Sequence, residues 1–415
     1  MTVRARTALA LGSAARWASR VTGRGAGAMI GGLVAMSLDR SVLGQLGARR
    51  RIVVVTGTNG KSTTTRMVAA ALRSIGSVAT NGEGANMDAG LVAALAADRD
   101  APLAALEVDE MHVPHVADAL DPAVIVLLNL SRDQLDRVGE INHIERTLRA
   151  GLTRHPDAVV VANCDDVLMT SAAYDCPNVV WVAAGGGWAS DSVSCPRSGE
   201  VIVREGSHWR STGADFSRPE PQWWVDGEKL HGPGGVALRI RLALPGAVNR
   251  GNAAQAVAAA VALGADPAAA VTAVCGVNEV AGRYRVVRVR DHTVRLLLAK
   301  NPAGWQEALS MVDKSAAGVV ISVNGQVPDG EDLSWLWDVR FEDFGTTAVV
   351  AAGERGTDLA VRLGYAGVEH TLVHDTVRAI ASCPPGHVEV VANYTAFLQL
   401  QRALDRSAGG RERDG

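Results

Sequence analysis

Lys61 and Ser62 directly follow a glycine-containing turn in the sequence TGTNGKSTTT, and a lysine–hydroxyl pair in this position is suited to phosphate chemistry. Glycines such as Gly57 and Gly60 let oxygen atoms approach the backbone N–H groups of the turn without a Cβ in the way. The lysine can neutralise the outer phosphates, and the serine hydroxyl is a ligand that Mg²⁺ accepts. The turn therefore predicts a nucleoside triphosphate site.

The flanking residues supply the elements that such a turn needs. Residues 52–55 are apolar and β-branched, which indicates a buried strand, and the alanine-rich residues after the turn have the period of a helix. Only Thr58 and Asn59 separate the two glycines, whereas four residues are usual in a P-loop. The alternative is a plain strand–turn–helix connection with a solvated lysine. We favour the phosphate loop because strand, turn, lysine and hydroxyl occur in register.

Acidic residues follow the next strong strand pattern, PLAALEVDE at 102–110. An acid at the carboxyl end of a strand beside a phosphate loop is well placed to hold Mg²⁺, directly or through water. Glu107 is the first candidate and Asp109 the second. The alternative is that both are solvated charges at the end of a strand.

Asparagine and further acidic side chains follow other predicted elements. Asn129, Asp133 and Asp136 lie where the strand pattern of 123–130 gives way to a loop or helix, and helix capping by Ser131 or Asp133 is the simpler interpretation there. Two alternatives remain open elsewhere. The loop of residues 80–90 is either a surface loop or one that faces substrate or nucleotide. Likewise, the asparagines that begin the alanine-rich helix after residue 245, Asn249 and Asn252, either cap that helix or contact nucleotide.

Length and composition indicate an α/β protein of two or three domains. The chain has 415 residues, 47% of them apolar, and its buried strand patterns alternate with helical ones, which predicts a doubly wound parallel sheet. A net charge of −3 gives no reason to expect nucleic acid binding. Five cysteines do not form a disulfide framework and favour a reducing cytoplasm.

The N-terminal residues are basic and contain the apolar run 26–36. This run is interrupted by glycines, lies far from the start for a signal peptide, and is shorter than the ~20 apolar residues of a membrane span. We therefore expect no transmembrane segment but a lead-in that packs on the first domain; a secondary interpretation places its arginines near an anionic membrane surface. The predicted parts are a lead-in (1–50), a central domain (51–282) with an antiparallel β insertion (185–245), a second α/β domain (283–405) and a tail (406–415).

The motif TGTNGKSTTT resembles the ATP loop of the Mur ligase family, which has the same short glycine spacing. The segments NLSRDQLDRVGEI and GAVNRGNAAQAVAAA resemble two further family segments, with Gln134 where amino-acid-adding members carry a metal-binding histidine. The resemblance implies Mg²⁺ held by Ser62 and Glu107, and Lys61 as the group that offsets phosphate charge. The implied ATP-binding residues are Thr58, Asn59, Gly60, Lys61, Ser62, Thr63 and, at the adenine, Asn252.

Within this family the chain is most similar to the MurT group of synthetase subunits. EVDE, SRDQLDR, KNPAGWQEAL, DLSWLWDVRFE and ANYTA resemble that group, and the first fifty residues lack the uridine-nucleotide domain of the amino-acid-adding ligases. The resemblance implies a Mur-ligase-like central P-loop ATPase domain and a C-terminal Rossmann-like domain. It also implies an ATP-dependent activity at the cytoplasmic face of the membrane, in which the α-carboxylate of D-glutamate in lipid II is phosphorylated and then amidated.

The ammonia for this reaction would come from a GatD-type glutaminase in a heterodimer. No cysteine here stands in a recognisable nucleophile turn with a histidine partner. In the resembled group an aspartate of the second domain completes the Cys–His pair of the partner, as the acid of a triad does. The segment DLSWLWD offers Asp332 and Asp338, and we favour Asp338.

Many MurT proteins carry a four-cysteine zinc ribbon, of which this sequence keeps only Cys195. One thiolate, even with His208, cannot supply a tetrahedral zinc site. We therefore expect no zinc, and a degenerate ribbon held by β pairing and by Trp209, Trp223 and Trp224. Two other functions remain open: a Mur-type or folylpolyglutamate-type ligase that adds an amino acid, and a nucleotide-binding scaffold without catalysis.

Overall fold

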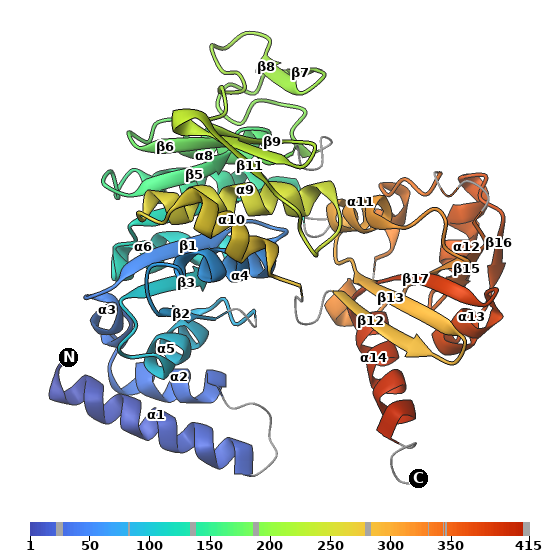
Figure 1. Ribbon diagram of the computed structural model, residues 1–415, viewed down its shortest axis with the longest axis horizontal. Coiled ribbons are helices and arrows are strands. Elements are labelled where there is room, and N and C mark those ends of the chain that lie inside the picture. The colour runs from blue at the N-terminus through green and yellow to red at the C-terminus, as the bar shows by residue number, and fades with distance from the viewer. Residues whose placement is uncertain are drawn as a thin grey trace. The chain divides into compact units, whose positions relative to one another are not determined.

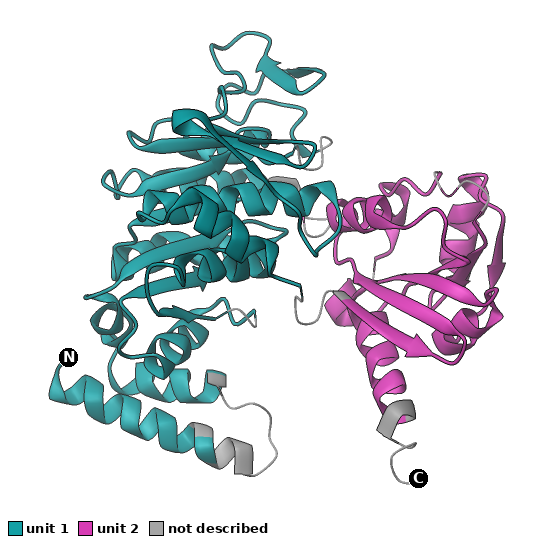
Figure 2. Cartoon of the chain, viewed as in Figure 1, with its two compact units in different colours: residues 1–131, 139–278 teal, residues 132–138, 279–415 magenta. Residues whose placement is uncertain are grey.

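The computed structural model describes residues 1–21, 28–81, 84–132, 138–185, 191–278, 284–330, 332–342, 344 and 347–409. The chain forms two compact units (Figure 2). Unit 1 comprises Met1–Ser131 and Gly139–Asn278, and unit 2 comprises Arg132–Val138 and Glu279–Gly415. The predicted α/β fold class is confirmed in both units.

A nine-stranded sheet is the centre of unit 1 as far as the structure describes it (Figure 1). Its order is β11-β10-β9-β6-β5-β4-β1-β3-β2, and β1 to β6 are parallel to one another. The strands are β1 (Arg51–Thr56), β2 (Val78–Thr80), β3 (Leu103–Glu107), β4 (Val124–Leu127), β5 (Val159–Asn163), β6 (Val179–Ala183), β9 (Trp223–Asp226), β10 (Lys229–Gly232) and β11 (Val236–Arg239).

Helices cover both faces of this sheet, so that β1 is buried along its length apart from Arg51. One face packs against α4 (Lys61–Leu72), α9 (Ala247–Ala262) and α10 (Pro267–Cys275). The other face holds a large apolar core, to which Ile52 and Val54 contribute. The helices that pack there are α3 (Val42–Gly47), α5 (Asp88–Ala97), α6 (Val113–Leu120), α7 (Val138–Leu152) and α8 (Val167–Ala173).

The residues expected as one β insertion are divided between two sheets. β7 (Ile202–Glu205) and β8 (His208–Ser211) form an antiparallel pair, whereas β9 pairs in parallel with β6 and is followed by the antiparallel β10 and β11. The expectation that Trp223 and Trp224 hold a ribbon fold is therefore wrong, because both lie on β9 in the large sheet.

The N-terminal residues form α1 (Val3–Val21) and α2 (Ala28–Leu38), which pack on each other, and α2 packs on α5. Both helices belong to unit 1. Among the described helices, none combines the length and apolar character that crossing a bilayer requires.

Unit 2 contains a six-stranded sheet in its described part, of order β12-β13-β17-β14-β15-β16, in which only the edge strand β12 is antiparallel to its neighbour. Apolar clusters lie on both faces of the sheet. The strands are β12 (Tyr284–Val289), β13 (His292–Leu298), β14 (Gly318–Ser322), β15 (Val349–Ala352), β16 (His370–Leu372) and β17 (Gly386–Ala392). The helices are α11 (Pro302–Met311), α12 (Gly356–Tyr365), α13 (Thr376–Ser382) and α14 (Tyr394–Gly409).

Candidate functional site

The turn between β1 and α4 is the centre of the candidate site. Gly57 and Gly60 have φ values of 140° and 85°, a region that side chains disfavour. A Cβ on Gly57 would lie 2.8 Å from Leu128 Cβ, and one on Gly60 would lie 3.0 Å from Asn252 Oδ1. Both glycines are therefore required by conformation and by close approach, which explains the tight spacing in the sequence.

The two residues between these glycines are held by the segment that follows β4. Asn129 binds Asn59 twice, since its Oδ1 accepts from Asn59 N at 3.0 Å and its Nδ2 donates to Asn59 O at 3.0 Å. Thr58 Oγ1 donates to Ser131 O at 3.1 Å and accepts from Ser131 N at 3.0 Å. Ser131 thus supports the loop, and the loop is pre-organised before a ligand binds.

The first turn of α4 points its N–H groups towards the space above the loop. Among the described residues no side chain caps this helix. An uncapped N-terminus preceded by glycine is the arrangement that binds anions, because unsatisfied donors and the helix dipole act together. Ser62 and Thr63, on this first turn, are both buried.

Lys61 is folded back over the loop. Its Nζ donates to Gly57 O at 2.6 Å and lies 3.1 Å from Glu110 Oε1. Both side chains are almost completely buried, at 10% and 11% exposure. Glu110, which the sequence analysis did not select, is thus the counter-ion of the lysine expected to bind phosphate.

Ser62 and Glu107 form the second polar pair of the site. Ser62 Oγ donates to Glu107 Oε2 at 2.8 Å, and Glu107 is only 2% exposed. Asn81 fixes the backbone of Glu107 from the neighbouring strand, because its Oδ1 accepts from Glu107 N and its Nδ2 donates to Glu107 O, both at 2.8 Å. A carboxylate and a hydroxyl side by side fit Mg²⁺, which prefers oxygen ligands and keeps several waters.

Asp109, the second metal candidate, has a different place. It is the N-cap of the short helix Glu110–His112, and its Oδ1 accepts from Met111 N at 3.1 Å. The two acids therefore have separate local roles, with Glu107 beside the serine and Asp109 at a turn. In the part of the chain that the structure describes, no three His, Cys, Asp or Glu side chains are grouped as a metal site.

Asn252 lies opposite the phosphate loop, in α9. It is 5% exposed and its amide faces Gly60. Neither Asn252 nor Asn249 caps the helix, because Gly246 occupies the N-cap position and Asn249 Nδ2 donates to Pro245 O at 2.6 Å. Capping, one of the two alternatives for these residues, is therefore wrong. Asp133, Gln134 and Asp136 lie outside the described residues.

A buried carboxyl group supports the same loop from behind. Asp166 accepts from Leu130 N at 3.1 Å and from Met169 N at 2.9 Å. Burial raises the pKa of Asp166 to about 6, although both N–H donors favour its charged form. The segment that carries Asn129 and Ser131 is therefore fixed by a group that titrates near neutral pH.

The two aspartates of DLSWLWD differ clearly in unit 2. Asp332 is exposed and accepts from Ser334 N at 2.8 Å and from Ser334 Oγ at 2.9 Å. Asp338 follows the short helix Ser334–Trp337, and its Oδ2 is buried without a hydrogen-bond partner among the described residues. Asp332 thus stabilises its own turn, whereas the buried Oδ2 of Asp338 has no such local role among the described residues.

The β7–β8 hairpin packs on unit 1 through an apolar cluster. Cys195, Trp209 and Phe216 are buried together, and Trp209 Nε1 donates to Cys164 O at 3.0 Å. Trp209 therefore has the packing role that the sequence analysis gave it. His208, which follows the turn between the two strands, is exposed.

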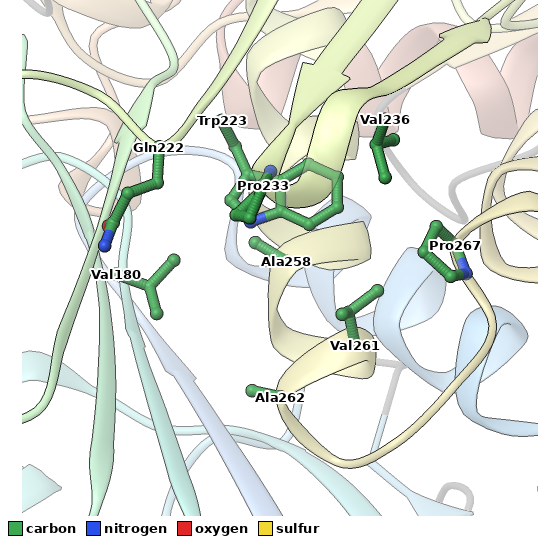
Figure 3. Close-up of a pocket in the computed structure, with 9 residues that line it drawn as sticks. All are labelled: Val180, Gln222, Trp223, Pro233, Val236, Ala258, Val261, Ala262 and Pro267. Carbon is green, nitrogen blue, oxygen red and sulfur yellow. The ribbon is translucent and has the colours of Figure 1, made fainter.

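An apolar cavity of ≈ 200 Å³ lies between α9 and the strands β6 and β9 (Figure 3). Trp223, Pro233, Ala258 and Val261 are among its lining residues. None of the residues predicted to bind ATP lines it. The cavity is therefore separate from the phosphate loop, although both involve α9.

Comparisons with known proteins show which families this chain is similar to. The family model described as Mur ligase middle domain matches residues 55–260, and that described as MurT ligase C-terminal matches residues 298–397. The chain is 28% identical to "Lipid II isoglutaminyl synthase (glutamine-hydrolyzing) subunit MurT" of Streptococcus pneumoniae, over 92% of this chain and 93% of that protein. It is 27% identical to the protein of the same name from Staphylococcus aureus, over 97% and 98%.

Solved structures show the same fold at low identity. A pseudomurein peptide ligase type C from Methanothermus fervidus superposes with a TM-score of 0.68 at 17% identity, over 88% of this chain and 81% of that chain. MurF ligase from Thermotoga maritima, solved in complex with ADP, superposes with a TM-score of 0.60 at 15% identity, over 92% and 85%.

Proposed function

This chain belongs to the MurT branch of the Mur ligase family, and on that premise we propose that it is the ATP-dependent synthetase subunit of a lipid II isoglutaminyl synthase. It would convert the α-carboxylate of D-glutamate in lipid II to the amide of D-isoglutamine, with glutamine as the amide donor. The observation that carries the proposal is the buried set of Lys61, Ser62 and Glu107 around an uncapped helix N-terminus.

The reaction we propose has two displacement steps. A carboxylate oxygen of the substrate attacks the γ-phosphorus of ATP, ADP leaves, and an acyl phosphate forms. Ammonia then attacks the carbonyl carbon, phosphate leaves, and the nitrogen loses a proton to give the amide. Both steps need charge neutralisation and alignment more than covalent help from the protein.

The residues of the loop fit these needs. Lys61 would move from Glu110 to the β- and γ-phosphates and offset their charge. Thr58 and Asn59 would lie over the phosphates, held by Ser131 and Asn129, while their own backbone N–H groups stay bonded to Asn129. The N–H groups at the start of α4 would donate to phosphate oxygens. Asn252, beside Gly60, would bind the adenine through its amide. Thr63 would complete the first helical turn at the phosphates.

The oxygen pair of Ser62 and Glu107 would hold Mg²⁺ bound with ATP. The metal, when bound, would neutralise charge on the transferred phosphoryl group. Asn81 would keep the Glu107 carboxylate in place, since it binds both backbone polar groups of that residue.

Ammonia would come from a GatD-type glutaminase that forms a heterodimer with this chain. Burial, with the nearby Asp165 carboxylate, raises the pKa of the Cys164 thiol to about 12, so this cysteine is a poor nucleophile. Cys195 and Cys383 are buried as well. The Asp338 carboxylate would orient the imidazole of the partner's Cys–His pair, which requires its buried Oδ2 to become accessible when the partner binds. We place the complex in the cytoplasm, at the inner face of the membrane.

Co-expression with the candidate glutaminase, followed by an amidation assay on lipid II, tests the proposal. With ATP, Mg²⁺ and glutamine, we expect one isoglutamine per lipid II and one ADP per amide formed. Lys61→Met should abolish turnover, whereas Lys229→Met, at an exposed lysine on β10, should not change it. Addition of a free amino acid to lipid II, without amidation, would instead show an amino-acid-adding ligase and overturn the proposal.

A further inference from the structure

The first 38 residues have a charge composition unlike that of the rest of the chain. They contain five arginines, at positions 4, 6, 16, 20 and 24, and no aspartate or glutamate. The whole chain nevertheless has a net charge of −3, so the remaining residues are clearly acidic in sum. Positive charge is therefore concentrated in the first 24 residues, most of which form α1.

Helix α1 exposes an apolar face that is flanked by arginine. Its buried side, which includes Ala5, Ala8 and Leu9, packs within unit 1. The opposite side exposes Val3, Leu11 and Trp17 at 79%, 50% and 69%. On a helical projection Arg4 and Arg6 lie at the two edges of this exposed face, and both are exposed. An apolar centre with basic edges is the pattern of helices that lie in a membrane interface.

Helix α2 adds a second exposed apolar face. It contains no charged residue, and Met29, Ile30 and Leu33 are 51%, 41% and 57% exposed. These three side chains share one side of the helix, since they lie at positions i, i+1 and i+4. Three large apolar side chains facing water on an uncharged helix indicate an interaction surface rather than isolated exposed residues.

Close glycine contacts fix α1 on α2 and α2 on α5, so that these faces cannot turn inwards. A Cβ on Gly12 of α1 would lie 2.4 Å from Gly31 O, and a Cβ on Gly32 of α2 would lie 2.0 Å from Ala89 O in α5. The backbones are therefore packed directly against one another. Figure 1 shows α1 along the outer edge of unit 1, with α2 lying next to α5.

We propose that α1 and α2 form a peripheral docking surface for an anionic phospholipid bilayer. The apolar side chains would enter the boundary between head groups and acyl chains, Trp17 would lie at the level of the head groups, and the arginines would contact lipid phosphates. Charge complementarity favours this occupant over a second copy of the chain, because two copies would bring arginine-rich surfaces together.

The docking surface is connected to the candidate site through α5 and the loop that precedes it. It rests on α5, and the loop before α5 contacts the turn that follows β3, because Asp109 N donates to Asn86 O at 3.2 Å. A bilayer bound by α1 and α2 would therefore lie one helix away from that loop. The inference does not depend on the proposed reaction, and vesicle binding and amidation are separate measurements.

Vesicle co-sedimentation of the full chain tests the proposal. We use vesicles of phosphatidylcholine alone and of phosphatidylcholine with about 30% phosphatidylglycerol, at about 0.1 M NaCl. We expect binding to the anionic vesicles to be at least about tenfold tighter, and Arg4→Glu/Arg6→Glu to remove most of this difference, since each arginine contributes about fivefold. Trp17→Gln/Leu33→Gln should weaken binding to both kinds of vesicle.

The matched control is Val201→Gln/Arg210→Glu, which removes one exposed apolar side chain and reverses one exposed arginine elsewhere in unit 1. It should bind vesicles like the unchanged chain. Because Arg4 Nε donates to Leu38 O at 2.8 Å, Arg6→Glu alone serves as a second variant that leaves this contact intact. ADP affinity checks folding in each case. The proposal would be overturned if the chain bound both kinds of vesicle equally, or if the control variant lost as much binding as the test variants. It would also be overturned if the chain did not bind vesicles but self-associated independently of salt, and Trp17→Gln/Leu33→Gln abolished that self-association.

Discussion

Lys61 and Glu110 form a buried ion pair in which Nζ lies 3.1 Å from Oε1, so the lysine expected to bind phosphate already has an anionic partner. A nucleotide must compete with this carboxylate. We therefore expect Glu110→Gln to tighten the binding of ADP, measured by calorimetry in Mg²⁺-free buffer. The gain should be roughly tenfold, because a hydrogen bond between charged groups contributes about 1.5–3 kcal/mol.

Asp109→Asn is the control for this measurement. It removes one negative charge next to Glu110 in the sequence but not the contact with Lys61, since Asp109 caps the turn at Met111. ADP affinity in this variant should stay within about twofold, as expected for a surface charge. Unchanged or weaker ADP binding by Glu110→Gln would show that the carboxylate positions the lysine instead of competing for it.

Asp338→Asn should separate amidation that depends on glutamine from amidation that uses added ammonia. The amide keeps the shape of the side chain but cannot stabilise an imidazolium as a carboxylate does, a substitution that reduces turnover by about 10⁴ in triads. With the glutaminase partner, glutamine-dependent amidation should be lost, whereas amidation from added ammonium salts should continue. Product analysis by mass spectrometry measures both rates.

Asp332→Asn is the matched variant from the same segment. Its carboxylate accepts from Ser334 and stabilises a turn, so we expect a stability loss of about 1 kcal/mol and normal use of glutamine. If Asp332→Asn abolished glutamine use and Asp338→Asn did not, the two assignments would have to be exchanged.

The pH dependence of stability should report on Asp166. Its pKa of about 6 is raised above the unfolded value of 3.8, so the folded state holds the proton more tightly. The resulting stabilisation is present at low pH and is lost as pH rises through about 6. Between about pH 5 and pH 7.5 this loss amounts to about 1 kcal/mol. Asp166→Asn should remove that slope, as measured by urea unfolding at both pH values.

The same substitution lowers stability at every pH, because an amide offers only one acceptor to the two N–H groups of Leu130 and Met169. The informative quantity is therefore the difference between the two pH values. Asp100→Asn, at an exposed position, should leave that difference unchanged. An equal difference in Asp166→Asn and the unchanged chain would contradict the role of this carboxyl group.

Metal analysis of the purified chain should find no stoichiometric zinc. Cys195 is buried with Trp209 and Phe216, in an apolar cluster that stabilises the β7–β8 hairpin by packing. A chelator should accordingly leave the thermal unfolding midpoint unchanged, whereas Trp209→Ala should lower stability by about 3–5 kcal/mol. One zinc per chain, or a lower thermal unfolding midpoint in the presence of the chelator, would contradict this expectation and indicate a zinc ribbon.

Local patterns were enough to predict the strand–turn–helix connection of β1 and α4 and most long strands. β1 and α4 follow from an apolar run, two glycines and helical periodicity, and the family assignment made from the loop motif is confirmed. The short strands β2 and β16, of three residues each, have too few residues for a period to show. The pairing of β9 with β6 joins Val182 to Trp223 across about forty residues, which no local pattern specifies.

The sequence alone also did not specify which partner each of the neighbouring acids contacts. Glu107, Asp109 and Glu110 lie within four residues, yet they contact Ser62, a backbone turn and Lys61 respectively. The first lies at the end of a strand and the others in a short helical turn, so that small differences in backbone direction decide their partners. A run of acids in the sequence therefore predicts a polar site but does not specify which acid contacts which partner.

The close approach of Gly60 to Asn252 would couple the two ends of the nucleotide site that we propose. A methyl group at position 60 would press on the amide that we assign to the base, at 3.0–3.1 Å from its oxygen and nitrogen. A substitution at Gly60, in the turn that we assign to the phosphates, would therefore also reduce selectivity between adenine and guanine nucleotides, although no residue assigned to the base had been changed. Fidelity for the base and affinity for the triphosphate would have to evolve together.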